Sequence, residues 1–400
     1  MSLHFTYPRR ILALALTSVA TAGTAFAQTT PSTATAPATR TGPVPAPAVS
    51  APSPKPMIDY FLPTPIVSPL TKEVWGADNV LPRDIKNGLE SREKMAKYCY
   101  WDGQIIKAKD GKYHMFASRW DESAGHNGWG NSKAVHAVSD NLYGPYEDKG
   151  PMWPDAEGIP QTITQGGKGH NVTALKLPED EGYAIVISET RPGEVWTCKD
   201  LNGPYTYKGK MSGVQTSNIS IMIRPDGDFQ IVPRNGQVYI SKKADGILGP
   251  YKSQGPSVFP RGIPNLEDPA LFYAGGLYHI TVNSWSTRKA YHLTSEDGIS
   301  NWKNRGLAYN PDADTVKYSD GTINHWSLME RPAPYIEDGV VKAYTMAVLD
   351  VPKAQERGND IHASKVIVIP FDGEAFNKDL NKLYADEKVA AAAIPAATPK

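Results

Sequence analysis

The chain has 400 residues, and its 42 Lys and Arg against 42 Asp and Glu give a formal net charge of zero. No basic run or stripe is present, which argues against nucleic acid or an anionic membrane surface as a partner. The two cysteines, Cys99 and Cys198, have no metal-binding or redox spacing. The sequence leaves open whether they form a disulfide.

Residues 1–27 are typical of an export signal. Arg9 and Arg10 give a charged start, an apolar run follows, and Ala25-Phe26-Ala27 is a small-residue cleavage site. The apolar run is shorter than the roughly 20 residues that a membrane span needs. We therefore expect export to the periplasm or the medium by the general or, given the paired arginines, the twin-arginine route. No membrane anchor is expected.

Two segments of low complexity flank the body of the chain. Residues 28–56 are mainly Ala, Pro, Thr and Ser, and they contain too little apolar surface to offset the entropy of ordering. This segment is predicted to be a disordered linker, and the Ala-rich residues 388–400 to be a disordered tail. The remaining residues 57–387 are predicted to form one domain, which would carry the function.

A repeat runs through this domain. Strand-like runs of about five to nine residues alternate with Gly, Asn and Asp turns, as in all-β proteins. An apolar strand, a polar turn and then Gly-Pro-Tyr or Asn-Trp recur in the segments that begin at Ser132, Gly193, Gly236 and Lys289. A fifth unit begins at Glu330. Five such units predict an all-β fold, a five-bladed β-propeller with four-stranded blades.

Carboxylates occur where several of these units begin. Asp102, Asp268 and Glu330 lie at or just before the innermost strands of units one, four and five. The corresponding places in units two and three hold His170-Asn171 and Ser217-Asn218. Because the inner strands of a propeller begin at one mouth of the central axis, we expect these side chains to face one funnel. Converging carboxylates are what cleavage of a glycosidic bond requires.

These motifs carry a family resemblance. The segment YWDGQIIKAKDGKYHMFAS resembles the opening blade of the five-bladed β-propeller glycosidases of glycoside hydrolase families 43 and 117. Trp101-Asp102 and Glu330-Arg331-Pro332 are similar to motifs of the more distant families 32 and 68. Glu267-Asp268-Pro269 departs from those two families, which have arginine in place of Glu267. The resemblance covers about residues 95–372.

The resemblance implies an exported glycoside hydrolase acting on a polysaccharide or oligosaccharide, with exo action expected because long loops can close the funnel. It makes Asp102 the base or nucleophile, Asp268 the residue that orients the sugar, and Glu330 the general acid. No cofactor is required. Relatives in family 43 often hold a calcium ion in the central channel, which here would be bound through water near His362.

The carbohydrate substrate is expected to meet aromatic, histidine and arginine side chains around the funnel. His126 lies in a Gly-rich loop near two tryptophans, and sugar faces stack on aromatic rings. Arg191 could hold a uronic acid carboxylate as a bidentate fork. The predicted substrate-binding residues are Trp101, Trp120, His126, His170, Arg191, Asn218, His325 and Arg331.

Two other functions fit the sequence. A polysaccharide lyase acting on a uronate-containing glycan would use His126 or His170 as base and Arg191 to neutralise the acid. A non-catalytic sugar-binding propeller would keep the fold and lose the chemistry. The stereochemistry of hydrolysis stays open, because it depends on the separation of the two catalytic carboxylates.

Overall fold

Five antiparallel sheets follow one another along the chain, four with four strands and one with three. The computed structural model describes residues 55–153 and 166–393. The predicted export signal, residues 28–54 of the predicted linker and residues 394–400 of the predicted tail lie outside the described residues. Within each sheet the strands pair in sequence order, as the repeated hairpins of the sequence predict.

The strands are grouped into blades as follows. Blade one contains β1 (Tyr98–Lys107), β2 (Tyr113–Asp121), β3 (Lys133–Ser139) and β4 (Glu147–Pro151). Blade two contains β5 (His170–Lys176), β6 (Tyr183–Glu189), β7 (Glu194–Cys198) and β8 (Thr206–Lys210). Blade three contains β9 (Ser220–Ile223), β10 (Phe229–Val232), β11 (Tyr239–Ser241) and β12 (Lys252–Ser253). Blade four contains β13 (Leu266–Ala274), β14 (Leu277–Ser284), β15 (Ala290–Ser295) and β16 (Lys303–Tyr309). Blade five contains β17 (Leu328–Glu337), β18 (Val340–Leu349) and β19 (Ser364–Pro370).

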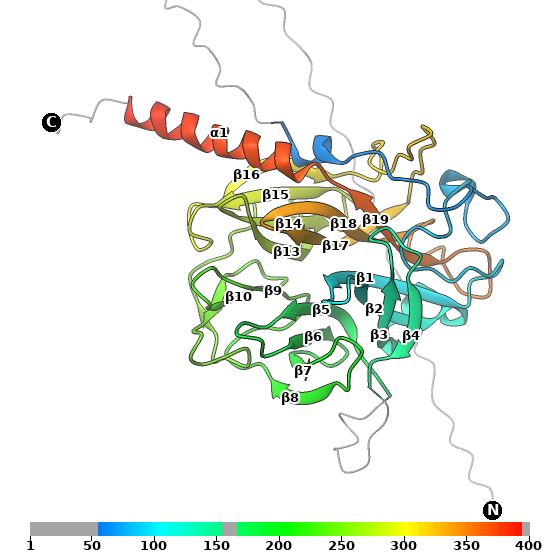
Figure 1. The fold of residues 1–400 in the computed structure, drawn as a ribbon. Helices are drawn as coiled ribbons and strands as arrows, with labels where there is room; N and C mark the ends of the chain where they lie inside the picture. Colours follow the sequence, from blue (N-terminus) through cyan, green and yellow to red (C-terminus); the bar gives the residue numbers. More distant parts are fainter. Residues whose placement is uncertain (1–54, 154–165, 394–400) are drawn as a thin grey trace, which may run out of the picture. The chain divides into compact units, whose positions relative to one another are not determined.

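The first strands of the blades form the axis of a propeller (Figure 1). Strand β1 contacts β5, β5 contacts β9, β9 contacts β13, β13 contacts β17, and β17 returns to β1. These five strands line an axial channel of about 970 Å³. The predicted five-bladed β-propeller is confirmed. Blade five contributes three consecutive strands, and its fourth place is filled from elsewhere in the chain.

Blade five is completed by the segment that precedes β1. Leu89 forms an isolated antiparallel bridge with Val366 of β19, with N–H···O distances of 2.9 and 3.0 Å. The side chain of Asn87 adds hydrogen bonds of 2.9 and 3.0 Å to the backbone of Val368. The place of a fourth strand is therefore held by residues from the start of the domain, which joins the two ends of the ring.

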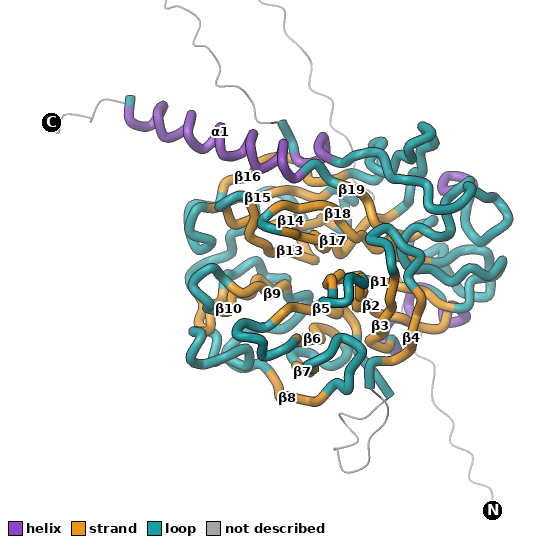
Figure 2. The backbone as a smooth tube through the Cα atoms, in the orientation of Figure 1, coloured by secondary structure: helices purple, strands orange, loops and turns teal. Residues whose placement is uncertain are grey.

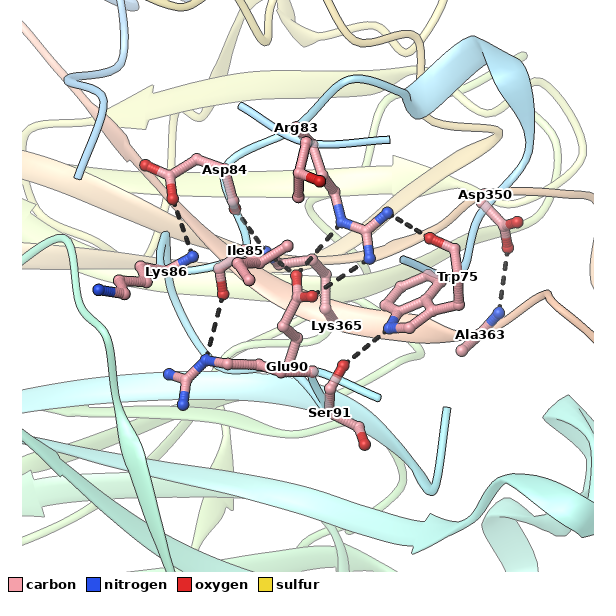
Figure 3. A network of polar contacts seen from close by, with 12 residues as sticks. Trp75, Arg83, Asp84, Ile85, Lys86, Glu90, Ser91, Asp350, Ala363 and Lys365 are labelled. Carbon is pink, nitrogen blue, oxygen red and sulfur yellow. Dashed lines mark hydrogen bonds and ion pairs between the residues drawn. The ribbon is translucent and has the colours of Figure 1, made fainter. Parts of the chain in front are cut away.

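A buried ionic network fixes this closing segment (Figure 3). Glu90 accepts hydrogen bonds of 3.3 and 3.2 Å from the Arg83 guanidinium and also pairs with Lys365 of β19. Arg83 lies over the ring of Trp75, 4.0 Å from its centroid. Two cations on one carboxylate satisfy charges that would otherwise be costly to bury.

The tyrosines of the Gly-Pro-Tyr repeats make the same hydrogen bond in each of the first three blades. The hydroxyl groups of Tyr146 and Tyr251 donate to backbone carbonyls four residues upstream, at 2.9 and 2.8 Å. Tyr205 makes the same hydrogen bond to Leu201. All three rings pack into the clusters of apolar side chains that join neighbouring blades. The repeat seen in the sequence thus marks an equivalent position in each blade.

Helix α1 (Gly373–Ala392) follows the last blade and is the long helix in Figure 2. Asp372 caps its start by accepting from the amide of Ala375, and Phe376, Leu380 and Tyr384 bury one face at a spacing of four residues. The predicted disordered tail from residue 388 is therefore wrong for residues 388–392, which are helical.

The other helices of the described residues are short 3-10 turns, η1 (Met57–Tyr60), η2 (Asp78–Val80), η3 (Glu122–Ala124) and η4 (His126–Asn131). None of the helices in the described part of the chain is long and apolar enough to cross a membrane.

Candidate active site

A polar cavity of about 240 Å³ lies at the ends of the inner strands where the predicted motifs occur. It is smaller than the cavities that usually hold drug-sized ligands. Side chains from every blade surround it, together with loop residues that follow β10 and β18. Its lining residues are Trp101, His126, Trp129, His170, Asn171, Glu189, Ser217, Asn218, Arg234, Glu267, Asp268, Glu330 and Lys353.

In or just before each inner strand, one non-glycine residue at this level has left-handed backbone. The five φ angles lie between 46° and 69°, at Asp102, Asn171, Asn218, Asp268 and Arg331. Asp and Asn adopt this conformation more readily than most residues, whereas arginine does so rarely. We call these five the floor residues. The residues immediately before them, Trp101, His170, Ser217, Glu267 and Glu330, all line the cavity and are called the wall residues.

The floor residues bond to one another across the axis. Asn171 donates to the side chain of Asn218 at 2.6 Å. Arg331 donates to Asp102 at 2.8 Å and lies 3.4 Å from Asp268. Arg331 is 8% exposed and the two aspartates are 2% and 4% exposed, so this is a buried ionic bridge. The floor therefore separates the cavity from the axial channel below it.

This layering corrects the predicted equivalence of the three acids. Asp102 and Asp268 are floor residues, whereas Glu330 is a wall residue, one position earlier. Asp102 lines the axial channel instead of the cavity. Its carboxylate accepts from Arg331, from the Ser118 hydroxyl and, at 3.0 Å, from the amide of Val172. The sequence motifs placed the three acids at equivalent positions. They could not show that Glu330 is one residue earlier in its strand, a shift that turns its side chain in a different direction.

Three carboxyl groups gather on the side of the cavity formed by blades four and five. Glu267, Asp268 and Glu330 each place one carboxylate oxygen within 4.8 Å of the others. We call them the cavity cluster. Each has a cationic partner: Arg234 lies 2.8 Å from Glu267, Lys353 lies 2.7 Å from Glu330, and Arg331 lies 3.4 Å from Asp268.

Burial raises the pKa of every member of this cluster. The pKa of Glu267 is raised to about 7, first by burial and then by the charges of Asp268 and Glu330. Burial also raises the pKa of Glu330 and of Asp268, against the opposing effects of the Lys353 and Arg331 cations. Since Arg331 is shared with Asp102, four carboxyl groups face three cations. The arrangement favours retention of one proton near neutral pH.

Aromatic and histidine side chains form the opposite wall. The ring of Trp101 lies 5.1 Å from that of His126, and the ring of Trp129 lies 5.1 Å from that of His170. Burial lowers the pKa of both histidines to about 3, so both are neutral at physiological pH. The Nδ1 atom of His170 lies 3.1 Å from the Ser132 hydroxyl. This wall offers ring faces and neutral polar atoms, as a sugar requires.

Three of the eight predicted substrate-binding residues lie away from the cavity. Trp120 is buried behind it and donates to the carbonyl of Gly125 at 3.0 Å. Arg191 pairs with Glu194 at 3.3 Å and does not line the cavity. His325 lies in a separate shallow hollow with Asp312. Of the other predicted residues, Trp101, His126, His170 and Asn218 line the cavity, and Arg331 lies in its floor.

The placement of His362 was predicted wrongly. It precedes β19, which is the third strand of blade five and not an inner strand. Its Nδ1 atom lies 2.7 Å from Asp350, and the residue is not among those that line the axial channel. The channel ion expected near His362 therefore has no support from this residue.

Cys99 and Cys198 are free and buried in separate blades.

Several cavity residues were missed by the sequence reasoning. Glu267 adjoins a predicted residue, and Glu189 stands two residues before the arginine that was chosen. Lys353 and Arg234 lie in loops with no repeating pattern. Trp129 was noted only as a neighbour of His126. The signal that could have found Glu267 is the position before each floor residue, since all five such residues face the cavity.

Comparison with known proteins gives similarity in structure only. No family model matches the sequence, and no curated protein matches it. A candidate exo-beta-1,3-galactanase from Bifidobacterium bifidum s17 is 13% identical, with a TM-score of 0.49 over 74% of this chain and 92% of its own. Zg3597, a family 117 glycoside hydrolase of Zobellia galactanivorans, is 11% identical, with a TM-score of 0.48 over 76% and 90%. A GH43_1 enzyme from Xanthomonas citri is 11% identical, with a TM-score of 0.42 over 68% and 88%.

Glycoside hydrolases of families 43 and 117 are thus among the solved structures that this chain resembles, as the sequence predicted. At such low identity, the chemistry of the cavity has to be inferred from its own residues.

Proposed function

We propose that this protein is a glycoside hydrolase that removes a terminal sugar unit from a saccharide chain. One observation carries the proposal. Three buried carboxyl groups, which together with Asp102 share only three cations, face neutral histidines and tryptophans across a small cavity. Glycosidic bond hydrolysis needs a protonated carboxyl group and an ionised one around a single sugar ring.

Glu330 is proposed as the general acid. Its Oε2 atom lies 2.7 Å from Lys353, while its Oε1 atom is buried and has no hydrogen-bond partner among the described residues. We propose that this oxygen carries the proton that passes to the oxygen of the leaving group. Asp268, beside Arg331, is proposed to support the positive charge that develops on the sugar ring.

Glu189 is proposed as the carboxylate that activates water. It lines the cavity and comes from blade two, outside the cavity cluster. Its Oε1 atom accepts from Ser217 and from the amide of Asn218, at 2.6 and 3.2 Å, which fixes its orientation. Asp102 was the predicted base, but three donors already occupy its carboxylate. We propose that Asp102 positions Arg331.

Exo action is proposed from the size of the cavity. A volume of about 240 Å³ suits a small ligand such as one sugar ring better than several units of a chain. The loop that carries His126 and the loop that carries Lys353 both contribute to the wall, which favours a closed pocket over an open groove.

The test is an assay on aryl glycosides and uronate-containing oligosaccharides, with products read by mass and by ultraviolet absorbance. Wild type is compared with Glu330→Gln and Glu189→Gln, and with Glu374→Gln as an exposed control on α1. We expect a water-added product that is lost in the first two variants and kept in the third. Azide should restore turnover to Glu189→Ala by replacing the activated water. Water-added product at wild-type rates from Glu330→Gln would sink the proposed acid.

A lyase is the second candidate, because the same cavity holds two neutral histidines with Lys353 and Arg234. A neutral histidine can take a proton next to a uronate, and the cations can bind its carboxylate. Arg191, the neutraliser expected from the sequence, lies outside the cavity. A dehydrated, ultraviolet-absorbing product that persists in Glu330→Gln would establish this alternative.

Export is proposed from the sequence of residues 1–27. Mass spectrometry of the mature chain from a periplasmic extract should find a new amino terminus near Gln28. An unprocessed chain in the cytoplasm would contradict it.

A further inference from the structure

A second group of three carboxyl groups lies outside the cavity, on two loops. Glu122 belongs to η3, and Glu356 and Asp360 lie in the loop between β18 and β19. Each places one carboxylate oxygen within 4.8 Å of the other two. We call them the loop cluster. They come from sequence positions more than 230 residues apart, so the fold brings them together.

Glu356 is the most unusual member of this cluster. The residue is 2% exposed, and both of its carboxylate oxygens are buried without a hydrogen-bond partner among the described residues. Burial raises its pKa to about 8; the charges of Asp360 and Glu122 add to this, and the amide of Gly358 opposes it. A buried carboxylate with neither donor nor cation is costly, so such a group usually binds a missing partner or keeps a proton.

No cationic side chain in the described part of the chain supplies that partner. Within residues 55–153 and 166–393, no lysine, arginine or histidine forms an ion pair with Glu122, Glu356 or Asp360. Among the described residues, the hydrogen bonds to the cluster come from backbone amides: that of Asp360 lies 3.5 Å from Glu122, and that of His362 lies 2.8 Å from Asp360. Three carboxyl groups therefore converge with no cationic side chain of the described residues between them.

We propose that the loop cluster binds one calcium ion. Calcium takes six to eight oxygen ligands and tolerates irregular geometry, which three carboxylates, backbone carbonyls and water can provide. Nitrogen and sulfur ligands, which zinc or copper would prefer, are absent from the described residues of the cluster. This site differs from the channel ion that the family resemblance led us to expect.

The ion would join the two loops that shape the cavity. The loop after β2 carries His126 and Trp129, and the loop after β18 carries Lys353. The two already touch, since the amide of His126 lies 3.4 Å from the carbonyl of Glu356. At Gly358, with φ of +81°, a Cβ atom would come within 2.4 Å of the Ser123 carbonyl oxygen. Binding would therefore hold both loops in the arrangement that lines the cavity.

The experiment measures calcium binding to the full chain after treatment with EDTA and dialysis. Titration calorimetry should give one site per chain, and excess calcium should raise the melting temperature by about 5 °C at a hundred-fold excess over Kd. Magnesium and manganese chloride are titrated in parallel, and both are expected to bind more weakly. Absence of binding and of any melting shift in the wild type would overturn the proposal.

Variants locate the ion. Glu356→Gln should weaken calcium binding at least about ten-fold, because it removes one charged ligand. It should also raise the melting temperature of the metal-free protein above about pH 8, where the wild-type Glu356 would carry an uncompensated buried charge. Asp268→Asn, in the cavity cluster, should bind calcium like wild type. Equal binding by wild type and Glu356→Gln, or loss of binding only in Asp268→Asn, would place the ion elsewhere and reject this site.

A second substitution and a second readout guard against misfolding of one variant. Asp360→Asn should reproduce the loss of binding. Limited proteolysis of the wild type should cut within residues 350–363 faster in EDTA than in calcium, while cleavage elsewhere stays unchanged. Equal cleavage rates in both conditions would contradict a role in holding the loops. These readouts use no substrate, so they stand or fall independently of the proposed hydrolase activity.

Discussion

The two groups of three carboxyl groups in this propeller, the cavity cluster and the loop cluster, differ in what surrounds them. In each cluster, one carboxylate oxygen of every member lies within 4.8 Å of the others. Each member of the cavity cluster has a lysine or arginine within 3.4 Å. None of the described residues gives the loop cluster such a partner.

The difference indicates two kinds of chemistry from one residue type. In the cavity cluster, fixed cations neutralise most of the charge, so the remaining proton is shared and can be transferred. In the loop cluster, balance must come from outside, through protons or a metal ion. Glu90 shows a third arrangement, because it is held between Arg83 and Lys365. A carboxylate paired in this way has no proton to transfer and no need of a metal ion.

The largest expected effect is on catalysis. Glu330→Gln should lower kcat about 10³-fold, since a general acid contributes roughly 10² to 10⁴. Its melting temperature should change little, because the substitution removes one of three mutually repelling groups. Steady-state kinetics and calorimetric melting on the same preparation test both. The comparison fails if activity and stability fall together, because that would assign Glu330 a purely structural role.

Removing a cation from the cavity cluster should have the next largest effect. Lys353→Met takes away the ammonium group 2.7 Å from Glu330, which holds the pKa of that carboxyl down. Without it the pKa of the cluster rises further, so the pH–rate profile should move to higher pH. We expect a loss of about 10- to 100-fold in kcat/KM at neutral pH, and less at alkaline pH.

A matching substitution shows whether this shift is specific. Lys342→Met removes an exposed lysine on β18 that pairs with Glu374 at 3.3 Å. Its pH–rate profile should coincide with that of wild type. If both variants shifted the profile alike, the effect would be due to net charge and not to the Lys353–Glu330 pair.

The loop cluster should be visible in the pH dependence of stability without metal. The pKa of Glu356 is about 8 in the folded protein against an ordinary value of 4.5. The folded state therefore binds more protons between these values, and stability falls as pH rises through this window. In EDTA the melting temperature should decline from about pH 5 to pH 8, and calcium should flatten the decline.

Glu356→Gln should remove much of that slope, and Glu267→Gln should remove a smaller part, since the pKa of Glu267 is about 7. Melting temperatures at five pH values, with and without calcium, distinguish the two. A slope that is unchanged in Glu356→Gln would show that the group is not titrating in this window.

The repeat was enough to predict the architecture, and the motifs led to the correct mouth of the propeller. Gly-Pro-Tyr and the hairpin turns are local signals, and each blade repeats them. These local signals could not predict which residue of each inner strand faces the cavity. The left-handed floor residues change the alternation of side chains along these strands. Hence Glu330 was placed with Asp102 when it belongs with Glu267. Lys353, Arg234 and Glu356 come from loops whose positions depend on long-range packing, so no spacing in the sequence indicated them.

The smallest effects separate the arginine that was expected from the one that the structure places in the cavity. Arg234 is half exposed and pairs with Glu267, so Arg234→Ala should raise KM a few-fold with little change in melting temperature. Arg191 lies outside the cavity and pairs with Glu194, whose pKa burial raises. Arg191→Ala should leave KM within about two-fold of wild type.

Stability should respond in the opposite order. Arg191→Ala leaves the mostly buried Glu194 carboxyl without its cation, which costs about 1–3 kcal/mol and lowers the melting temperature by several degrees. Arg234→Ala removes an arginine that is itself half exposed, so its ion pair with Glu267 is screened by solvent and should contribute less to stability. Arg234→Ala should therefore lose substrate affinity and keep its stability, whereas Arg191→Ala should keep its affinity and lose stability. If Arg191→Ala instead raised KM and left the melting temperature unchanged, Arg191 would be a substrate-binding residue, as the sequence predicted. That result would support a uronate substrate bound outside the present cavity.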